Sequence, residues 1–127
     1  MHKIDSTTPS KSFLKAISTP GITRSTTSTI AQLRLAHAPL NSYLKHFKRV
    51  DSARCPACSA DNEDIAHYLL TCPSYAYERW ALACQAKKNH KTMSLKMLLG
   101  DPKMVIPLAN FIDATHRFGK HGEPLSI

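Results

Sequence analysis

The chain has 127 residues and a formal charge of +8, from 17 basic and 9 acidic residues. This length fits one small domain, excludes a polymerase or a large nuclease, and gives a modest core that a bound metal ion would stabilise. No run of 18 apolar residues is present, which excludes a transmembrane helix, and no apolar segment marks a secretory signal. We therefore expect an intracellular protein, nuclear or cytoplasmic, that is not secreted and does not contact membranes.

The basic charge is concentrated in the first part of the chain. Residues 1–50 hold eight basic residues and one acidic residue, whereas residues 51–127 are nearly balanced. Such a segment is either a solvated surface or a surface that faces the phosphates of a nucleic acid. Composition leaves both interpretations open.

The first predicted helix follows an irregular start. Residues 1–24 are expected to be irregular, because prolines and Gly21 punctuate them. Residues 26–38 are predicted to be helical and to end before Pro39. Their apolar residues do not follow one stripe, so we expect this helix to be buried on more than one side.

Two short helices are predicted around a loop at residues 51–60. Asn41 is expected to cap a helix that runs to about Phe47. A second helix is expected to start near residues 61–62, where acidic side chains favour the positive end of the helix dipole. It should stop by Thr71, because Pro73 disfavours a helical conformation at the residue before it.

Ser74 is predicted to cap the next helix, which runs to about Lys87. Tyr77, Trp80 and Cys84 share one face of that helix, and we expect this face to enter the core. For Trp80 the alternative is stacking on nucleic-acid bases, as for Tyr68 or Tyr75. For Cys84 the alternative is a substitute metal ligand.

The last part of the chain contains the clearest helical pattern. A short helix is expected at residues 93–99, ended by Gly100. The final helix should begin at Pro102 or Pro107 and stop at Gly119. Its apolar face is formed by Leu108, Phe111, Ile112, Thr115 and Phe118.

Three cysteines and one histidine have the spacing of a zinc knuckle. Cys55, Cys58, His67 and Cys72 form the pattern C-x2-C-x8-H-x4-C, in which a C-x2-C turn presents two sulfurs to one ion. Three other roles for these cysteines are less favoured. Disulfides suit a secreted chain, and this chain shows no secretory signal; a redox C-x-x-C motif needs a βαβ context, and none is visible. Reduced cysteines buried as core residues are a poor fit to the hydrophilic loop that carries CPAC. Four good ligands indicate a closed, structural site for Zn²⁺.

No strand pattern or internal repeat is visible. We therefore predict a mainly α fold, a small multi-helix domain organised around a Cys3His zinc knuckle. This domain is expected to span residues 25–119, between a flexible segment at 1–24 and a flexible tail at 120–127.

Several segments together resemble one family. HAPLN at 37–41, CPAC at 55–58, IAHYLLTCP at 65–73, LLGDPK at 98–103 and DATHRF at 113–118 resemble the C-terminal region of LINE-type (non-LTR) retrotransposon polyproteins, particularly fungal ones. Those polyproteins carry a reverse transcriptase and often an RNase H ahead of a zinc knuckle. The resemblance implies that the knuckle ligands are the same four residues. It also implies that the chain is a detached tail of a longer polyprotein.

The chain departs from that family at two glycines. Ser59 and Ala36 stand where the family usually has Gly, so the turn after Cys58 must be made without free access to a positive φ, at little cost if the loop relaxes. The clustered carboxylates that reverse transcription or RNase H chemistry requires are absent from the sequence. We therefore expect no enzymatic activity.

The sequence favours a zinc-stabilised module that binds RNA or DNA with low sequence specificity. One alternative is a docking element for the RNase H and reverse transcriptase domains of the parent element. Another is an element remnant without function. The cations expected to meet phosphates are Arg34, Lys45, Lys48, Arg49 and Arg54.

Overall fold

The computed structural model of the chain describes residue 15 and residues 21–118, and these residues form helices and loops without strands. This confirms the predicted mainly α fold. The predicted tail, the turn at Gly119 and nearly all of the expected irregular start lie outside the described residues. In chain order the helices are α2 (Arg24–Arg34), α3 (Asn41–His46), the π-helix η1 (His67–Thr71), the 3₁₀ helix η2 (Pro73–Tyr75), α4 (Ala76–Lys88), α5 (Leu95–Leu98), the 3₁₀ helix η3 (Pro102–Met104) and α6 (Val105–Thr115).

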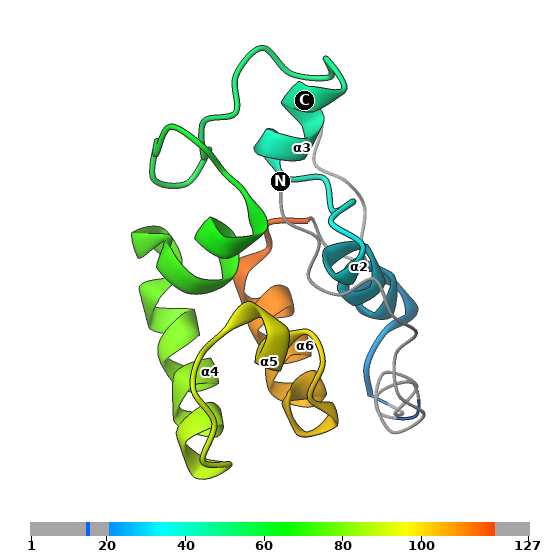
Figure 1. Cartoon of the computed structure of the whole chain (residues 1–127), viewed down its shortest axis with the longest axis vertical. Coiled ribbons are helices and arrows are strands. Elements are labelled where there is room, and N and C mark those ends of the chain that lie inside the picture. Colours follow the sequence, from blue (N-terminus) through cyan, green and yellow to red (C-terminus); the bar gives the residue numbers. More distant parts are fainter. Residues whose placement is uncertain (1–14, 16–20, 119–127) are drawn as a thin grey trace.

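The core is built around α6, which lies between α4 and α2 (Figure 1). Its predicted apolar face is correct, since Leu108, Phe111 and Ile112 are buried. The helix ends earlier than expected, at Thr115, because His116 adopts the left-handed conformation with φ 53°. No helix among residues 21–118 has the length and apolar composition needed to cross a lipid bilayer.

The α2 helix is buried along one stripe, so the prediction of burial on several sides is wrong. The buried residues recur at helical spacing and include polar side chains, while Leu35, just past the helix, is exposed. The two threonines can be buried because their hydroxyls are hydrogen-bonded. Thr26 donates to Asp113 Oδ1 on α6 at 2.7 Å, and Thr29 donates to Ser25 O at 3.0 Å. The buried residues are Thr26, Thr29, Ile30, Leu33 and Arg34.

The α2 helix also ends earlier than predicted. The helix stops at Arg34, well before Pro39, because Ala36 adopts φ 60°. The His37 N–H then donates to Gln32 O and the Ala36 N–H donates to Leu33 O. These two bonds form a Schellman motif, which satisfies carbonyls that a helix end leaves free.

The α3 helix is not capped by Asn41, which is its first residue; Leu40 occupies the cap position and offers no side-chain bond. The free N–H groups of its first turn are satisfied from another part of the chain. Asn41 N–H donates to Glu63 Oε1 at 2.8 Å, and Ser42 N–H donates to Glu63 O at 3.0 Å. The start of α3 therefore depends on the loop that carries the candidate metal ligands.

The α4 helix faces the other way from the prediction. It buries Leu82 and Ala86, whereas Tyr77 is 84% exposed, Trp80 is 68% exposed and Cys84 is exposed. The predicted placement of this face in the core is wrong, because the residues that pack on α6 lie on the opposite side of the helix. Cys84 is therefore neither a core residue nor near the other cysteines.

One ion pair is buried at the centre of the structure. Arg117, just after α6, makes two bonds to the fully buried Glu63 carboxylate, from Nε to Oε2 at 2.7 Å and from Nη2 to Oε1 at 2.6 Å. Burial alone lowers the pKa of Arg117, but the Glu63 carboxylate outweighs it and the net direction is upward. The pair joins the end of the described chain to the loop at residues 53–63.

We expect Arg117→Leu to lower the free energy of unfolding by about 3–5 kcal/mol, because it leaves a buried carboxylate without its counter-charge. The matched control is Lys91→Ala, which breaks a more exposed pair with Asp101 at 3.3 Å and should cost at most about 1 kcal/mol. Urea denaturation followed by circular dichroism measures both. Equal costs in the two variants would contradict the central role of the buried pair.

Candidate metal centre

The four predicted ligand residues gather at one point of the structure. The ligand atoms of Cys55, Cys58, His67 and Cys72 all lie within 4.8 Å of one another. Cys55 Sγ is 3.9 Å from Cys72 Sγ, and Cys58 Sγ is 3.3 Å from His67 Nε2. A tetrahedral ion with metal–sulfur bonds of about 2.3 Å places its sulfurs about 3.8 Å apart. The donor set and its spacing therefore fit one metal ion.

The first two ligands are held by a tight loop. Cys55 N–H donates to Ala60 O and Ser59 N–H donates to Cys55 O, both at 2.9 Å. These bonds close the chain on itself, and Ser59 adopts φ 67° to complete the turn. The loop does not relax away from this conformation, because the two backbone bonds require the turn, so Ser59 adopts the positive φ that glycine favours.

The last two ligands are brought together by an unusual helix. A short helical turn begins at Ile65, not at residues 61–62, and Asp64 Oδ1 accepts from His67 N–H at 2.8 Å. The chain then continues as the π-helix η1, in which Cys72 N–H donates to His67 O at 2.7 Å. This wider turn brings residues five apart to the same side. Cys72 itself is extended, as Pro73 predicts.

The ring of His67 is oriented by its own helix. Thr71 Oγ1 lies 3.3 Å from His67 Nδ1 and also donates to His67 O at 3.4 Å. A hydroxyl that donates to the carbonyl is free to accept from Nδ1–H, which leaves the Nε2 lone pair directed at the sulfurs. Metal-binding histidines commonly hold their second nitrogen in this way.

The two cysteines of the CPAC loop differ in their electrostatics. Burial raises the pKa of the Cys55 thiol to about 11, whereas a hydrogen bond from the backbone of Ala60 lowers the pKa of the Cys58 thiol. Metals bind the thiolate, so metal uptake at this site releases protons. Of the two CPAC thiols, Cys58 is the more readily deprotonated.

Arg79, on α4, completes the support of the site and was not found in the sequence analysis. Its guanidinium donates to the carbonyls of Tyr68, Leu69 and Cys72 at 2.8–2.9 Å. These bonds give hydrogen-bond partners to backbone carbonyls of η1 and Cys72, which the end of a helix leaves without partners. Ser74, expected to cap α4, instead donates to Ala57 O at 2.9 Å and ties the CPAC loop to η2.

Four of the five cations predicted to bind nucleic acid are on the surface near this centre. They are exposed, and they lie on α3 or in the loop between α3 and Cys55. Arg34 is not among them: it is 7% exposed and donates from Nη1 to Leu99 O. Its prediction as a phosphate contact is wrong, because it belongs to the buried stripe of α2. The four exposed cations are Lys45, Lys48, Arg49 and Arg54.

The aromatic residues near the centre are mostly structural. Tyr68 is fully buried, its hydroxyl lies 2.7 Å from Thr115 Oγ1, and its ring packs against Phe111 and Phe118. Burial raises the pKa of Tyr68 and also raises the pKa of the half-buried Tyr75 to about 12. Tyr68 is therefore unable to stack on a nucleic-acid base, contrary to the alternative considered for it.

We expect Cys58→Ser and His67→Ala to abolish stoichiometric metal binding and to reduce helical content, since apparent binding energies at such sites are about 10–16 kcal/mol. Cys84→Ser is the matched control, because this thiol is exposed on α4 and lies outside the ligand group. Elemental analysis of the purified proteins and circular dichroism before and after chelation give the readout. Full metal content in His67→Ala would argue against this ligand set.

We expect Ser59→Gly to raise the free energy of unfolding by about 0.5–1 kcal/mol, because glycine adopts φ 67° without strain. Ser59→Val should lower it, since a β-branched side chain is least tolerated there. Thermal melting of the metal-loaded proteins measures both changes. A stabilised Val variant would show that this turn is not strained.

No protein-family model, curated protein or solved structure matches this chain.

Proposed function

We propose that this chain is a non-catalytic nucleic-acid-binding module whose Cys3His centre holds Zn²⁺ as a structural ion. The observation that carries the proposal is the exposure of four cations on α3 and on the loop between α3 and the centre. Three thiolates and one imidazole suit zinc, which favours tetrahedral sulfur and nitrogen ligands. With all four positions occupied by protein, zinc here would organise the fold and supply no reaction.

The centre and α3 are connected by hydrogen bonds on both sides. Asn41 Nδ2 donates to Arg54 O at 2.6 Å, just before Cys55, and Asn41 N–H donates to Glu63 Oε1 beyond the CPAC loop. An ion that orders this loop thereby also fixes α3. Metal binding is therefore expected to favour nucleic-acid binding, although the four metal-ligating side chains themselves would not contact the nucleic acid.

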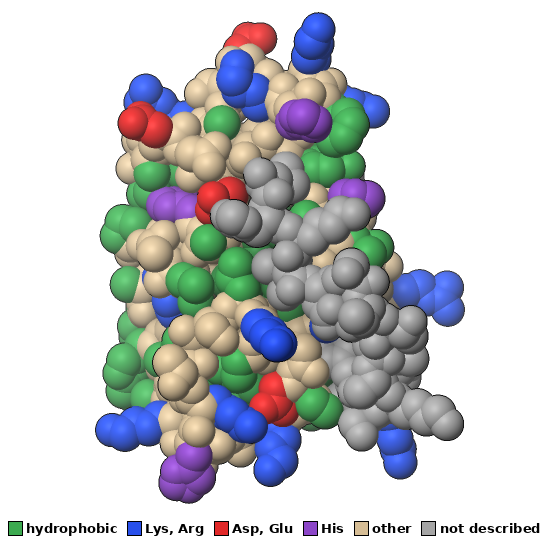
Figure 2. Space-filling model, viewed as in Figure 1, with side chains coloured by type: hydrophobic (Ala, Val, Ile, Leu, Met, Phe, Trp, Pro, Cys, Tyr) green, Lys and Arg blue, Asp and Glu red, His purple; other side chains and the backbone are tan. Residues whose placement is uncertain are grey.

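The charge distribution supports a phosphate-facing surface at this end of the molecule. Three thiolates and one Zn²⁺ carry a net charge of −1, so attraction to phosphates must come from the neighbouring cations. Figure 2 shows Lys and Arg side chains at the upper end of the molecule, over α3 and the loop that follows it. Lys and Arg side chains also gather at the opposite end of the molecule, where α4 ends with Lys87 and Lys88 in its last turn (Figures 1 and 2).

The positive φ values support the proposed origin in a LINE-type polyprotein. Ala36 and Ser59 are the two positions at which the resembling family usually has glycine, and both adopt a left-handed conformation, with φ 60° and 67°. A glycine is favoured at such positions for its freedom of φ. The alignment proposed from the sequence thus places glycines where this backbone needs them.

We expect Lys45→Gln/Arg49→Gln to weaken binding to a single-stranded RNA and to reduce the slope of log K against log salt by about 0.7 for each lost phosphate contact. Removal of the metal should weaken binding further, because α3 loses its support. Fluorescence anisotropy at several salt concentrations measures both effects. The matched control is Lys87→Gln/Lys88→Gln, which removes two exposed charges from the opposite end.

Two results would contradict this proposal. Binding that does not change with salt would exclude phosphate contacts. A larger loss in the α4 control than in the α3 variant would place the nucleic acid at the opposite end of the molecule.

The alternative function, docking of a neighbouring domain of the parent polyprotein, is favoured by one other surface. A groove of about 370 Å³ lies between α4 and α6, where exposed Tyr77 and Trp80 flank Pro107 and Ala114. Exposed tyrosine and tryptophan are common in protein interfaces. Trp80 is the only tryptophan, so a blue shift of its emission on adding the RNase H domain of such an element would support docking.

A further inference from the structure

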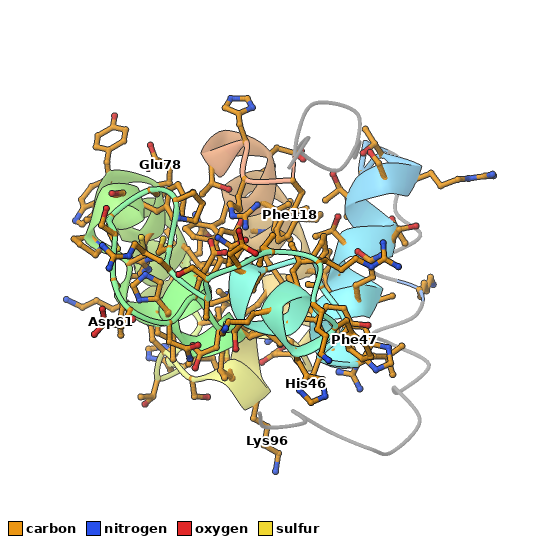
Figure 3. The ribbon with its side chains drawn as sticks, turned by 90° about the horizontal axis from the view of Figure 1, so that it is seen from above. His46, Phe47, Asp61, Glu78, Lys96 and Phe118 are labelled. Carbon is orange, nitrogen blue, oxygen red and sulfur yellow. The ribbon has the colours of Figure 1, made fainter. Side chains whose placement is uncertain are left out.

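A continuous row of aromatic rings lies on and beside α3. The ring centroids of His37 and Tyr43 are 5.6 Å apart, those of Tyr43 and Phe47 are 4.8 Å apart, and those of His46 and Phe47 are 5.0 Å apart. Phe47 is 56% exposed, and both histidines are exposed. Figure 3 shows His46, the last residue of α3, close to Phe47, which follows it.

The row does not serve the core of the domain. No residue of α3 is buried, and the helix is held instead by its backbone bonds to the metal-site loop. An exposed phenylalanine between two polar aromatic rings gains little from folding. The aromatic surface is therefore available for a ligand that offers flat π-faces.

Cations alternate with these rings along the chain. Lys45 lies between Tyr43 and the pair of His46 and Phe47, and Lys48 and Arg49 follow directly. All three cations are exposed. The cations therefore lie close to the rings in sequence, before and after the pair of His46 and Phe47. A surface that combines aromatic rings with cations suits the bases and phosphates of a single strand.

The end of α3 keeps the last two cations next to the rings. Lys48 adopts φ 58°, Arg49 N–H donates to Leu44 O at 2.8 Å and Lys48 N–H donates to Lys45 O at 2.9 Å. This is a Schellman motif in which a lysine occupies the position that glycine favours. The chain turns back at once instead of carrying the cations away from Phe47.

We propose that this aromatic row is a stacking platform for the unpaired bases of single-stranded nucleic acid, with Phe47 and His46 against the bases and Lys45, Lys48 and Arg49 at the phosphates. This inference rests on the proposed function and adds the class of nucleic acid and the residues that select it. Bases in a duplex are stacked on each other and cannot reach the rings, so single strands are preferred.

The first test uses Phe47→Ala with a single-stranded 12-mer and its duplex, by anisotropy at three salt concentrations. The variant is expected to lose about one order of magnitude in affinity for the single strand. Duplex affinity and the salt slope should not change, because no phosphate contact is removed. Leu35→Ala is the matched control, since Leu35, just past α2, is 58% exposed and lies outside the row. Thermal melting verifies that both variants are folded.

The second test moves the tryptophan into the row. In Phe47→Trp/Trp80→Phe, the only tryptophan lies at position 47, and its emission should be quenched by the single strand but not by the duplex. In the unmodified chain, Trp80 should report little change. Neither position belongs to the buried core, so the exchange is expected to leave the fold intact.

The outcomes separate the two proposals. Salt-dependent binding that Phe47→Ala leaves unchanged, with no quenching at position 47, would overturn the stacking platform and leave the proposed function intact. Quenching of Trp80 instead would move the stacking site to α4 and also overturn it. Failure of the unmodified chain to bind either nucleic acid would overturn both.

Discussion

The structure depends on the placement of one buried carboxylate. Glu63 has no exposed surface, yet it accepts two bonds from Arg117 and one from the backbone of Asn41. Its own backbone donates to Ala53 O at 2.7 Å and accepts from Ser42. An unpaired carboxylate in this position would cost several kcal/mol, so the end of α6, the start of α3 and the metal-site loop must come together for any of them to be stable.

This arrangement links the metal centre to the proposed nucleic-acid surface. The loop at residues 53–63 carries Cys55 and Cys58 and is closed at its base by the bond between Ala53 and Glu63. α3 packs few side chains and is positioned mainly by that loop. A small domain of this length has a limited core, so the buried pair, and an ion bound at the Cys3His centre, would each supply a large share of its stability. The hydrogen bonds of Asn41 and Ser42 to Arg54 and Glu63 are thus the contacts through which metal binding would act on α3 under the proposed function.

Several helix ends in this chain use a left-handed residue that is not glycine. Ala36, Lys48 and His90 each follow a helix with the two bonds of a Schellman motif, and His116 follows α6 in the same conformation. Each such residue costs about 1–2 kcal/mol relative to a relaxed backbone. Lys48 adopts this costly conformation within the proposed binding surface. There a lysine supplies a positive charge that glycine would lack.

The sequence alone determined the helical class, the four ligand residues, the extended Cys72 before Pro73 and the buried face of α6, because spacing and proline chemistry act locally. It did not determine which face of α4 is buried or that Arg34 is internal, because both depend on the partner helix against which each side packs. Nor did it reveal the Glu63–Arg117 pair, whose members are 54 residues apart. A local pattern specifies a helix and its two faces. Only the tertiary structure decides which face meets the core, and here that choice left Trp80 and Phe47 on the surface.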